Sequence, residues 1–250
     1  MEKDLKNNIL KYLLMILLIV IILNISMLFN SQQKENEVKE NELKFLREDN
    51  STYVEMKLPA VDSEGNGVTT VLSVEVSPGN GKTLIDINNL LFFADTQHSI
   101  RIAKNVAEKI TEKNMNNYNL VYGVEANASL IGGPSAGAAL TIATIAAVEG
   151  KQIRKDVMIT GAVNSDGSIG PVGEILAKAK AAKEAGASIF LVPLLQSRDV
   201  IYDTVESCEK FGASEICTTE TRPRKVNVIE ETGINVVEVA SVEEALKYFY

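Results

Sequence analysis

The sequence predicts a mixed α+β fold preceded by one N-terminal transmembrane helix. Hydrophobic residues make up 46% of the 250-residue chain, which is enough for a packed core. From about residue 53 onwards, strand-like alternation and helix-like spacing of apolar residues follow one another along the chain. Before that point the chain is first apolar and then polar and rich in charge. We therefore predict an anchor at 1–30, a polar juxtamembrane linker at 31–52 and one domain at 53–250.

The anchor prediction depends on residues 9–29, in which the one charged residue is Lys11. This length is about the 20 residues that a helix needs to span a bilayer. The segment has no polar face and no Ala-x-Ala-like cleavage site after it, which argues against a core helix and a cleaved signal peptide. Lysines are equally numerous on its two sides, so their count gives no orientation. Because an apolar segment this near the N-terminus commonly exports the chain after it, we expect a single-pass protein with an extracytoplasmic domain.

The domain should begin with strands. Residues 54–59 are rich in apolar side chains, and residues 68–76 alternate between two faces. The turn-prone stretch 77–81 then leads into a third strand-like segment at 82–87. We expect the segments on either side of this turn to pair as a β-hairpin.

The rest of the domain should alternate helices and strands. Apolar side chains recur at helical spacing early in this part, and a later segment that is apolar all round predicts a buried helix. Short apolar runs between the helices predict buried strands. The expected helices are 99–113, 136–148, 174–184 and 242–250, and the expected strands are 118–125, 157–159, 189–193 and 236–239.

Composition and motif checks argue against nucleic acid, metal and nucleotide. The net charge is −8 and the pI about 4.9, with no basic stripe. Cys208 and Cys217 are the only cysteines and belong to no Cys/His cluster, so they are compatible with a disulfide or with two free thiols. Residues 81–83, GKT, resemble the end of a P-loop, but Val76 stands where the motif needs its first glycine and a strand-like segment follows. We expect no cofactor and no metal.

The run GPSAG at 133–137 matches the pattern G-x-S-x-G and makes Ser135 a candidate nucleophile. Taken alone, the pattern also fits a serine that caps the following helix. An α/β-hydrolase triad needs a histidine after the serine, whereas the single histidine, His98, precedes it. The remaining possibility is a serine activated by a lysine, whose neutral amine takes the hydroxyl proton.

Lys178 is the candidate base by geometry. At 100° per residue along the expected helix 174–184, it falls on the apolar face beside Ile175, while Lys180 and Lys183 lie on the other side. A buried lysine is costly unless it is neutral or paired. The alternative is a lysine whose head reaches water along the helix surface, and the helical spacing does not decide between the two.

These motifs resemble those of the Lon protease family over about residues 67–249. The run at 133–137 resembles its nucleophile motif, and GEILAK at 173–178 resembles its Gly-Gly-x-x-x-Lys segment at the family's spacing. Thr160-Gly161 resembles its Thr-Gly-Glu step, with Ala162 where glutamate is usual. Gly132 stands where many members carry an acidic residue, and the segment 196–232 is longer than the usual loop. Because the sequence shows no P-loop, we expect the family's ATPase to be absent.

The resemblance implies a Lon-type proteolytic fold and a Ser135/Lys178 dyad. It further implies that Thr160 helps to position Lys178 and that backbone N–H groups bind the oxyanion. Because Pro134 has no N–H, Gly133 and Ser135 are the better candidates for that role.

The expected protein is most similar to small, membrane-anchored, ATPase-less Lon-like serine proteases of archaea. It would act as an ATP-independent serine endopeptidase on unfolded or short polypeptides, and by family analogy as a homo-hexamer. The alternative is a catalytically silent, membrane-tethered interaction scaffold with the same fold.

Overall fold

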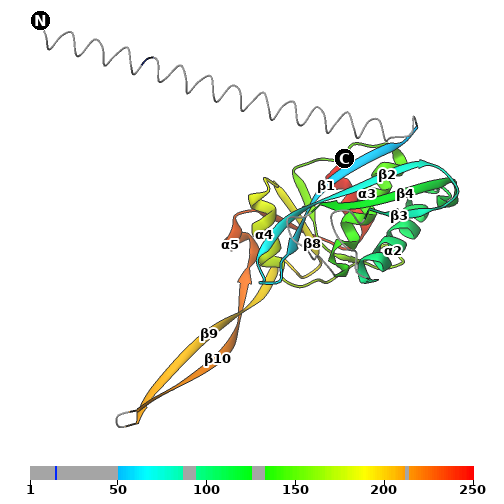
Figure 1. Ribbon diagram of the computed structural model, residues 1–250. Helices are drawn as coiled ribbons and strands as arrows, with labels where there is room; N and C mark the ends of the chain where they lie inside the picture. Colours follow the sequence, from blue (N-terminus) through cyan, green and yellow to red (C-terminus); the bar gives the residue numbers. More distant parts are fainter. Residues whose placement is uncertain (1–14, 16–49, 87–93, 126–132, 212–213) are drawn as a thin grey trace, which may run out of the picture. The chain divides into compact units, whose positions relative to one another are not determined.

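The computed structural model describes residues 15, 50–86, 94–125, 133–211 and 214–250 (Figure 1). The chain divides into two units, Met1–Asn50 and Ser51–Tyr250, and the fold concerns the second. The predicted anchor and nearly all of the linker lie outside the described residues. Within the described part of the chain, no helix is both long enough and apolar enough to cross a membrane.

A four-stranded sheet with the order β1-β2-β4-β3 forms one side of the unit (Figure 1). Its members are β1 (Thr52–Val61), β2 (Gly67–Pro78), β3 (Thr83–Ile85) and β4 (Tyr118–Glu125). The pairs β1–β2 and β2–β4 are antiparallel, whereas β3 runs parallel to β4. Alternate residues of β2 are buried, as expected for a sheet with one covered face.

The predicted hairpin between residues 68–76 and 82–87 is wrong, because β4 lies between the two segments. The turn that joins them binds to the start of β4 and not to itself. The backbone N–H groups of Asn80 and Lys82 each donate to the side-chain oxygen of Asn119, at 3.1 Å. These hydrogen bonds hold the turn at the start of β4, so that β3 pairs with β4 and not with β2.

The helix α3 (Gly137–Glu149) packs on the sheet, α2 (Ala94–Thr111) packs against α3, and the short 3₁₀ turn η1 (Met115–Asn117) precedes β4. Nearly every residue of α3 is buried, which confirms the helix predicted from its uniformly apolar sequence. Its polar atoms are satisfied inside the core: the Thr144 hydroxyl lies 2.8 Å from the Tyr122 hydroxyl.

A second sheet separates two hydrophobic cores. It consists of β5 (Val157–Ile159), β8 (Ile189–Pro193) and β11 (Asn235–Val239), all parallel, in the order β11-β8-β5. Successive side chains of a strand point to opposite faces, so Leu191 belongs to the first core, which includes α2 and α3, while Phe190 belongs to the second core.

The helix α4 (Ile175–Glu184) covers the second core together with α5 (Val228–Thr232), and α4 also contacts β1 and β2. The chain closes with α6 (Val242–Phe249), which packs into the first core. A small antiparallel pair, β6 (Ala162–Val163) and β7 (Ile169–Gly170), comes after β5 in the chain.

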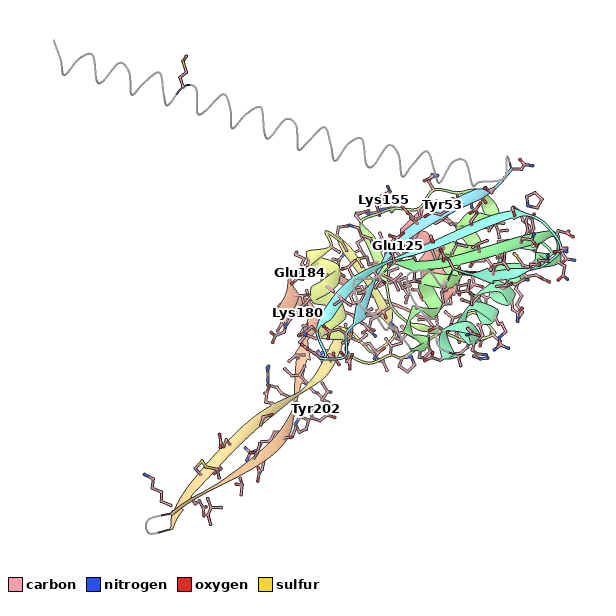
Figure 2. All side chains as sticks on the ribbon, viewed as in Figure 1. Tyr53, Glu125, Lys155, Lys180, Glu184 and Tyr202 are labelled. Atoms are coloured by element: carbon pink, nitrogen blue, oxygen red, sulfur yellow. A yellow bond between two sulfur atoms is a disulfide. The ribbon has the colours of Figure 1, made fainter. Side chains whose placement is uncertain are left out.

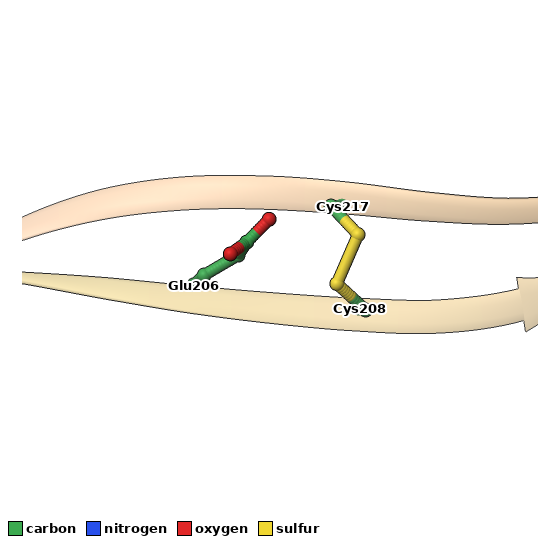
Figure 3. A group of neighbouring side chains, drawn as sticks. All are labelled: Glu206, Cys208 and Cys217. Atoms are coloured by element: carbon green, nitrogen blue, oxygen red, sulfur yellow. A yellow bond between two sulfur atoms is a disulfide. The ribbon is translucent and has the colours of Figure 1, made fainter.

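The segment for which the sequence predicted no element forms a long antiparallel ribbon that extends away from both cores (Figure 1). Its strands are β9 (Arg198–Phe211) and β10 (Ser214–Asn227). Cys208 and Cys217 face each other across the ribbon and form a disulfide. Glu206 lies beside them, and its carboxylate oxygen and the two sulfur atoms all lie within 4.8 Å of one another (Figure 3). Because sulfurs bonded to each other offer no thiolate, this group is not a metal site.

Candidate active site

Ser135 is attached through its backbone to the carboxyl end of the second sheet. Thr160 directly follows β5, and its N–H donates to the carbonyl of Leu191 in β8, at 3.0 Å. The Thr160 hydroxyl donates to the carbonyl of Ser135 at 3.3 Å, and the N–H of Gly161 donates to the same oxygen at 2.9 Å. In return, the N–H of Ala138 donates to the Gly161 carbonyl at 2.9 Å. These bonds fix the serine's backbone against Thr160-Gly161.

Ser135 lies in a 3₁₀ turn, η2 (Pro134–Ala136), that leads directly into α3. Gly133 enters this turn at φ 107°, a conformation that residues with a side chain rarely adopt. A Cβ atom at Gly137 would lie 2.9 Å from the backbone nitrogen of Val163, so only glycine fits this close approach. The structure therefore explains why glycine occupies both positions of G-x-S-x-G. The turn places Ser135 at the N-terminus of a buried helix, which carries a positive partial charge.

Lys178 points into the protein from α4. Its side chain is buried, with the residue 6% exposed, whereas Lys180 is exposed on the outer face of the helix (Figure 2). The helical spacing predicted this difference, which is confirmed. The Lys178 amine donates to the carbonyl of Gly173 at 2.9 Å and has no ion pair within the described residues. Burial lowers the pKa of Lys178, while the negative charges of Glu174 and Asp199 act to raise it.

The structure does not join the two halves of the predicted dyad by a hydrogen bond. Among the described residues, the Lys178 amine bonds to Gly173 and not to the Ser135 hydroxyl. The Thr160 hydroxyl, for which the family resemblance implies a role in positioning Lys178, bonds to the Ser135 backbone. Catalytic hydrogen bonds are often long in ligand-free proteins and tighten when substrate binds. The roles of Ser135, Lys178, Thr160 and Gly133 stay predictions, and His98 lies exposed on α2.

Two residues near the site escaped the sequence reasoning. Asp199 accepts a hydrogen bond from the N–H of Leu176 at 2.8 Å. The side-chain amide of Gln196 bonds to both backbone groups of Val172, accepting at 2.9 Å and donating at 2.6 Å. In the sequence, Gln196 and Asp199 are a carboxamide and a carboxylate shortly after a buried strand. Their partners become clear only in the structure, where the start of α4 lies beside them.

A cleft of about 710 Å³ borders the same start of α4 from outside. It is lined by residues 65–67, the outer face of α4 and the base of β9, where Figure 2 shows Lys180, Glu184 and Tyr202. Gly173 and Glu174 reach it, but Ser135 and Lys178 are not among its lining residues. The cleft therefore borders the candidate site, but it is not lined by the candidate nucleophile or the candidate base.

Residues 67–210 match the Lon protease (S16) C-terminal proteolytic domain, which covers more than half of the chain. The chain therefore belongs to the Lon proteolytic domain family, as the resemblance of its motifs predicted.

Particular relatives extend the comparison. The archaeal Lon proteases of Thermoplasma volcanium and Thermoplasma acidophilum are each 30% identical over 142 residues, which is 56% of this chain. The Lon protease of Fervidobacterium nodosum is 30% identical over 188 residues, or 72% of this chain. The matches cover 22%, 22% and 21% of these three relatives, so the chain spans about a fifth of their length.

Proposed function

We propose that this protein is a membrane-anchored, ATP-independent serine endopeptidase in which Ser135 is the nucleophile and Lys178 the base. The observation that carries the proposal is Lys178 itself, which is buried on α4 without an ion pair among the described residues and whose pKa is lowered by burial. A neutral amine is what a serine nucleophile needs when no histidine is at hand. Membership of the Lon proteolytic domain family supports the serine peptidase class.

In the first half of the reaction, the Ser135 oxygen attacks the peptide carbonyl as the neutral Lys178 amine takes the hydroxyl proton. The C=O π electrons move to oxygen and form a tetrahedral oxyanion. When this collapses, the C–N bond breaks and the lysine returns its proton to the leaving amine. The products are a free amine and an acyl ester on Ser135.

In the second half, neutral Lys178 takes a proton from water, whose oxygen attacks the ester carbon. The second tetrahedral intermediate expels the Ser135 oxygen, which recovers its proton from the lysine. For either half the Lys178 amine must turn from the Gly173 carbonyl towards the serine. Gly173 is an exposed residue, so water can replace the lost hydrogen bond at its carbonyl.

The oxyanion would be stabilised at the head of α3. The N–H groups of Gly133 and Ser135 are the candidate donors, and Pro134 between them has none. The Ser135 carbonyl accepts from the Thr160 hydroxyl and the Gly161 N–H, and these bonds hold the turn that carries the candidate donors. The helix N-terminus adds a positive partial charge at the same place.

The anchor and the outward orientation belong to this proposal. They are supported by the apolar run 9–29 and by the disulfide between Cys208 and Cys217, because disulfides persist in oxidising compartments. We also propose a homo-hexamer, by analogy with the family alone.

Independence from ATP is supported by the structure of the P-loop-like turn. Lys82 precedes the strand β3, whereas a phosphate-binding loop leads into a helix N-terminus. Because an ATP-independent peptidase does not use ATP to unfold its substrates, suitable substrates are unfolded, short or already cleaved chains.

The test is hydrolysis of fluorescently labelled casein by the purified full chain in detergent. We expect Ser135→Ala and Lys178→Ala each to lose activity by about 10³-fold or more. Lys180→Ala is the matched control, because Lys180 lies two residues away on the same helix and is exposed; it should stay near wild type. Equal rates for wild type and Ser135→Ala would overturn the proposal, and no hydrolysis by either protein would favour the interaction scaffold.

A further inference from the structure

We propose that Asp199 is a positioning residue of this peptidase, whose carboxylate fixes the first turn of α4 and thereby the place of the Lys178 amine. This inference rests on the proposed Ser135/Lys178 chemistry. Asp199 makes no hydrogen bond to the serine or the lysine in the described structure, so it would act through the helix and through its charge.

The helix α4 begins without a cap of its own. Glu174 occupies the N-cap position at φ 61°, in the left-handed region, and its side chain makes no capping hydrogen bond. The first N–H groups of a helix have no partner inside the helix and need one from elsewhere. Asp199, which belongs to β9, supplies it by accepting from the N–H of Leu176 at 2.8 Å.

The capping carboxylate is itself fixed in direction. Its other oxygen accepts from the N–H of Val200 at 2.9 Å, which restricts rotation of the side chain. On the other side of Gly173, Gln196 binds both backbone groups of Val172. Gln196 and Asp199, both shortly after β8, therefore hold the chain on both sides of Gly173, whose carbonyl accepts from Lys178.

Asp199 also acts on Lys178 through its charge. The charged groups whose field reaches Lys178 among the described residues are Glu174, from the start of α4, and Asp199, from β9. Both favour the protonated amine, against the burial that favours the neutral one. Asparagine at 199 would keep an oxygen to cap the helix but remove the charge, whereas alanine would remove both.

This difference gives a test in the full chain. In Asp199→Ala, we expect the plateau of kcat/KM against pH to fall by about tenfold, because a small displacement of a catalytic group is costly. In Asp199→Asn, the plateau should stay within about twofold of wild type, since the amide oxygen still caps Leu176. Its acid limb should move to lower pH, because loss of the negative charge lowers the pKa of Lys178.

Asp203→Asn is the matched control. Asp203 lies on the same strand and pairs with Arg224 in the ribbon, at 2.7 Å, and it should change neither plateau nor limb. An Asp199→Ala protein with the wild-type plateau and limb would overturn the proposal. So would equal losses in Asp199→Ala and Asp199→Asn with an unmoved limb, since these would indicate general damage.

A second readout does not depend on peptidase activity. Hydrogen exchange of the amides at 175–178 should be at least about tenfold faster in Asp199→Ala than in wild type, with exchange in α3 unchanged. If wild type and Ser135→Ala hydrolyse casein equally, the peptidase proposal fails, and this exchange still decides whether Asp199 caps α4. Unchanged exchange at 175–178 would overturn the positioning role by itself.

Discussion

The amine of Lys178 donates a hydrogen bond to the carbonyl of Gly173, 2.9 Å away, and this is its one bond within the described residues. A neutral backbone oxygen does not compensate a buried positive charge as a carboxylate would. The site thus keeps a lysine whose charged form is disfavoured, which suits a base and weakens the fold. The first prediction concerns that weakness.

Lys178→Met should make the protein more stable while it abolishes hydrolysis. The folded-state pKa of Lys178 lies below its ordinary value of 10.5, so the unfolded chain binds the proton more tightly. The cost of burying the charge is therefore fully present below the folded-state pKa and disappears as pH rises towards 10.5. We expect a gain in the free energy of unfolding on the order of 1 kcal/mol near neutral pH, shrinking at alkaline pH. Thermal unfolding across pH measures it.

The control for this stability effect is Lys180→Met, which alters an exposed lysine of the same helix and should leave the midpoint almost unchanged at every pH. A Lys178→Met protein less stable than wild type near neutral pH would show that the amine contributes more through its hydrogen bond than it costs by burial.

Removing the Thr160 hydroxyl should reduce hydrolysis more than it reduces the stability of the fold. Its hydroxyl, almost fully buried, donates to the Ser135 carbonyl, which also accepts from the N–H of Gly161. Thr160→Val keeps the shape and leaves that carbonyl with one partner, so we expect a loss of about 0.5–1.5 kcal/mol in the free energy of unfolding. Hydrolysis should fall further than this loss explains, and Thr160→Ser should restore it. Activity in Thr160→Val equal to wild type would separate Thr160 from the site.

The two glycines of the serine and lysine motifs should respond differently to alanine. At Gly137 a new Cβ would approach the backbone nitrogen of Val163 to 2.9 Å, whereas at Gly173 it would meet no atom within 4 Å. We expect Gly137→Ala to lower the free energy of unfolding by about 1–3 kcal/mol, although alanine favours a helix. Gly173→Ala should cost little. Chemical denaturation of both variants compares them, and equal midpoints would contradict the close approach.

Local patterns in the sequence were sufficient for the helices that carry the site. Because α3 is buried on all sides, its apolar sequence alone indicates a buried helix, and the helical spacing along α4 is enough to separate Lys178 from Lys180. The pairing of β3 with β4 was not accessible in this way, since it depends on contacts of the turn with Asn119, far along the chain.

The ribbon escaped prediction for a physical reason. Only the base of the ribbon, at Ile201 and Val226, packs against the second core, so burial imposes no alternation of apolar residues along most of β9 and β10. Pro223 within β10 also argues against a strand. The hydrogen bond from Leu176 to Asp199 also escaped prediction, because a cap that comes from a distant strand gives no signal in the sequence next to the helix.

The disulfide should stabilise the outer part of the ribbon and nothing else. The base of the ribbon is tied down by Val228, whose N–H donates to the Ser197 carbonyl at 3.1 Å, but an isolated two-stranded ribbon is marginal in water. Cys208 and Cys217 close a short loop, with a sequence separation of 9, which contributes about 2–3 kcal/mol locally.

The double substitution of Cys208→Ser and Cys217→Ser should therefore accelerate hydrogen exchange near the cysteines on the order of 10–100-fold. The thermal midpoint of the unit should stay unchanged, because neither hydrophobic core includes a residue of the outer ribbon. Asp203→Asn, which breaks an exposed ion pair nearer the base, should have a much smaller effect on this exchange. A fall in the midpoint together with faster exchange in α3 would mean that the ribbon supports the cores after all. Unaltered exchange in the ribbon would mean that its strand pairing needs no crosslink.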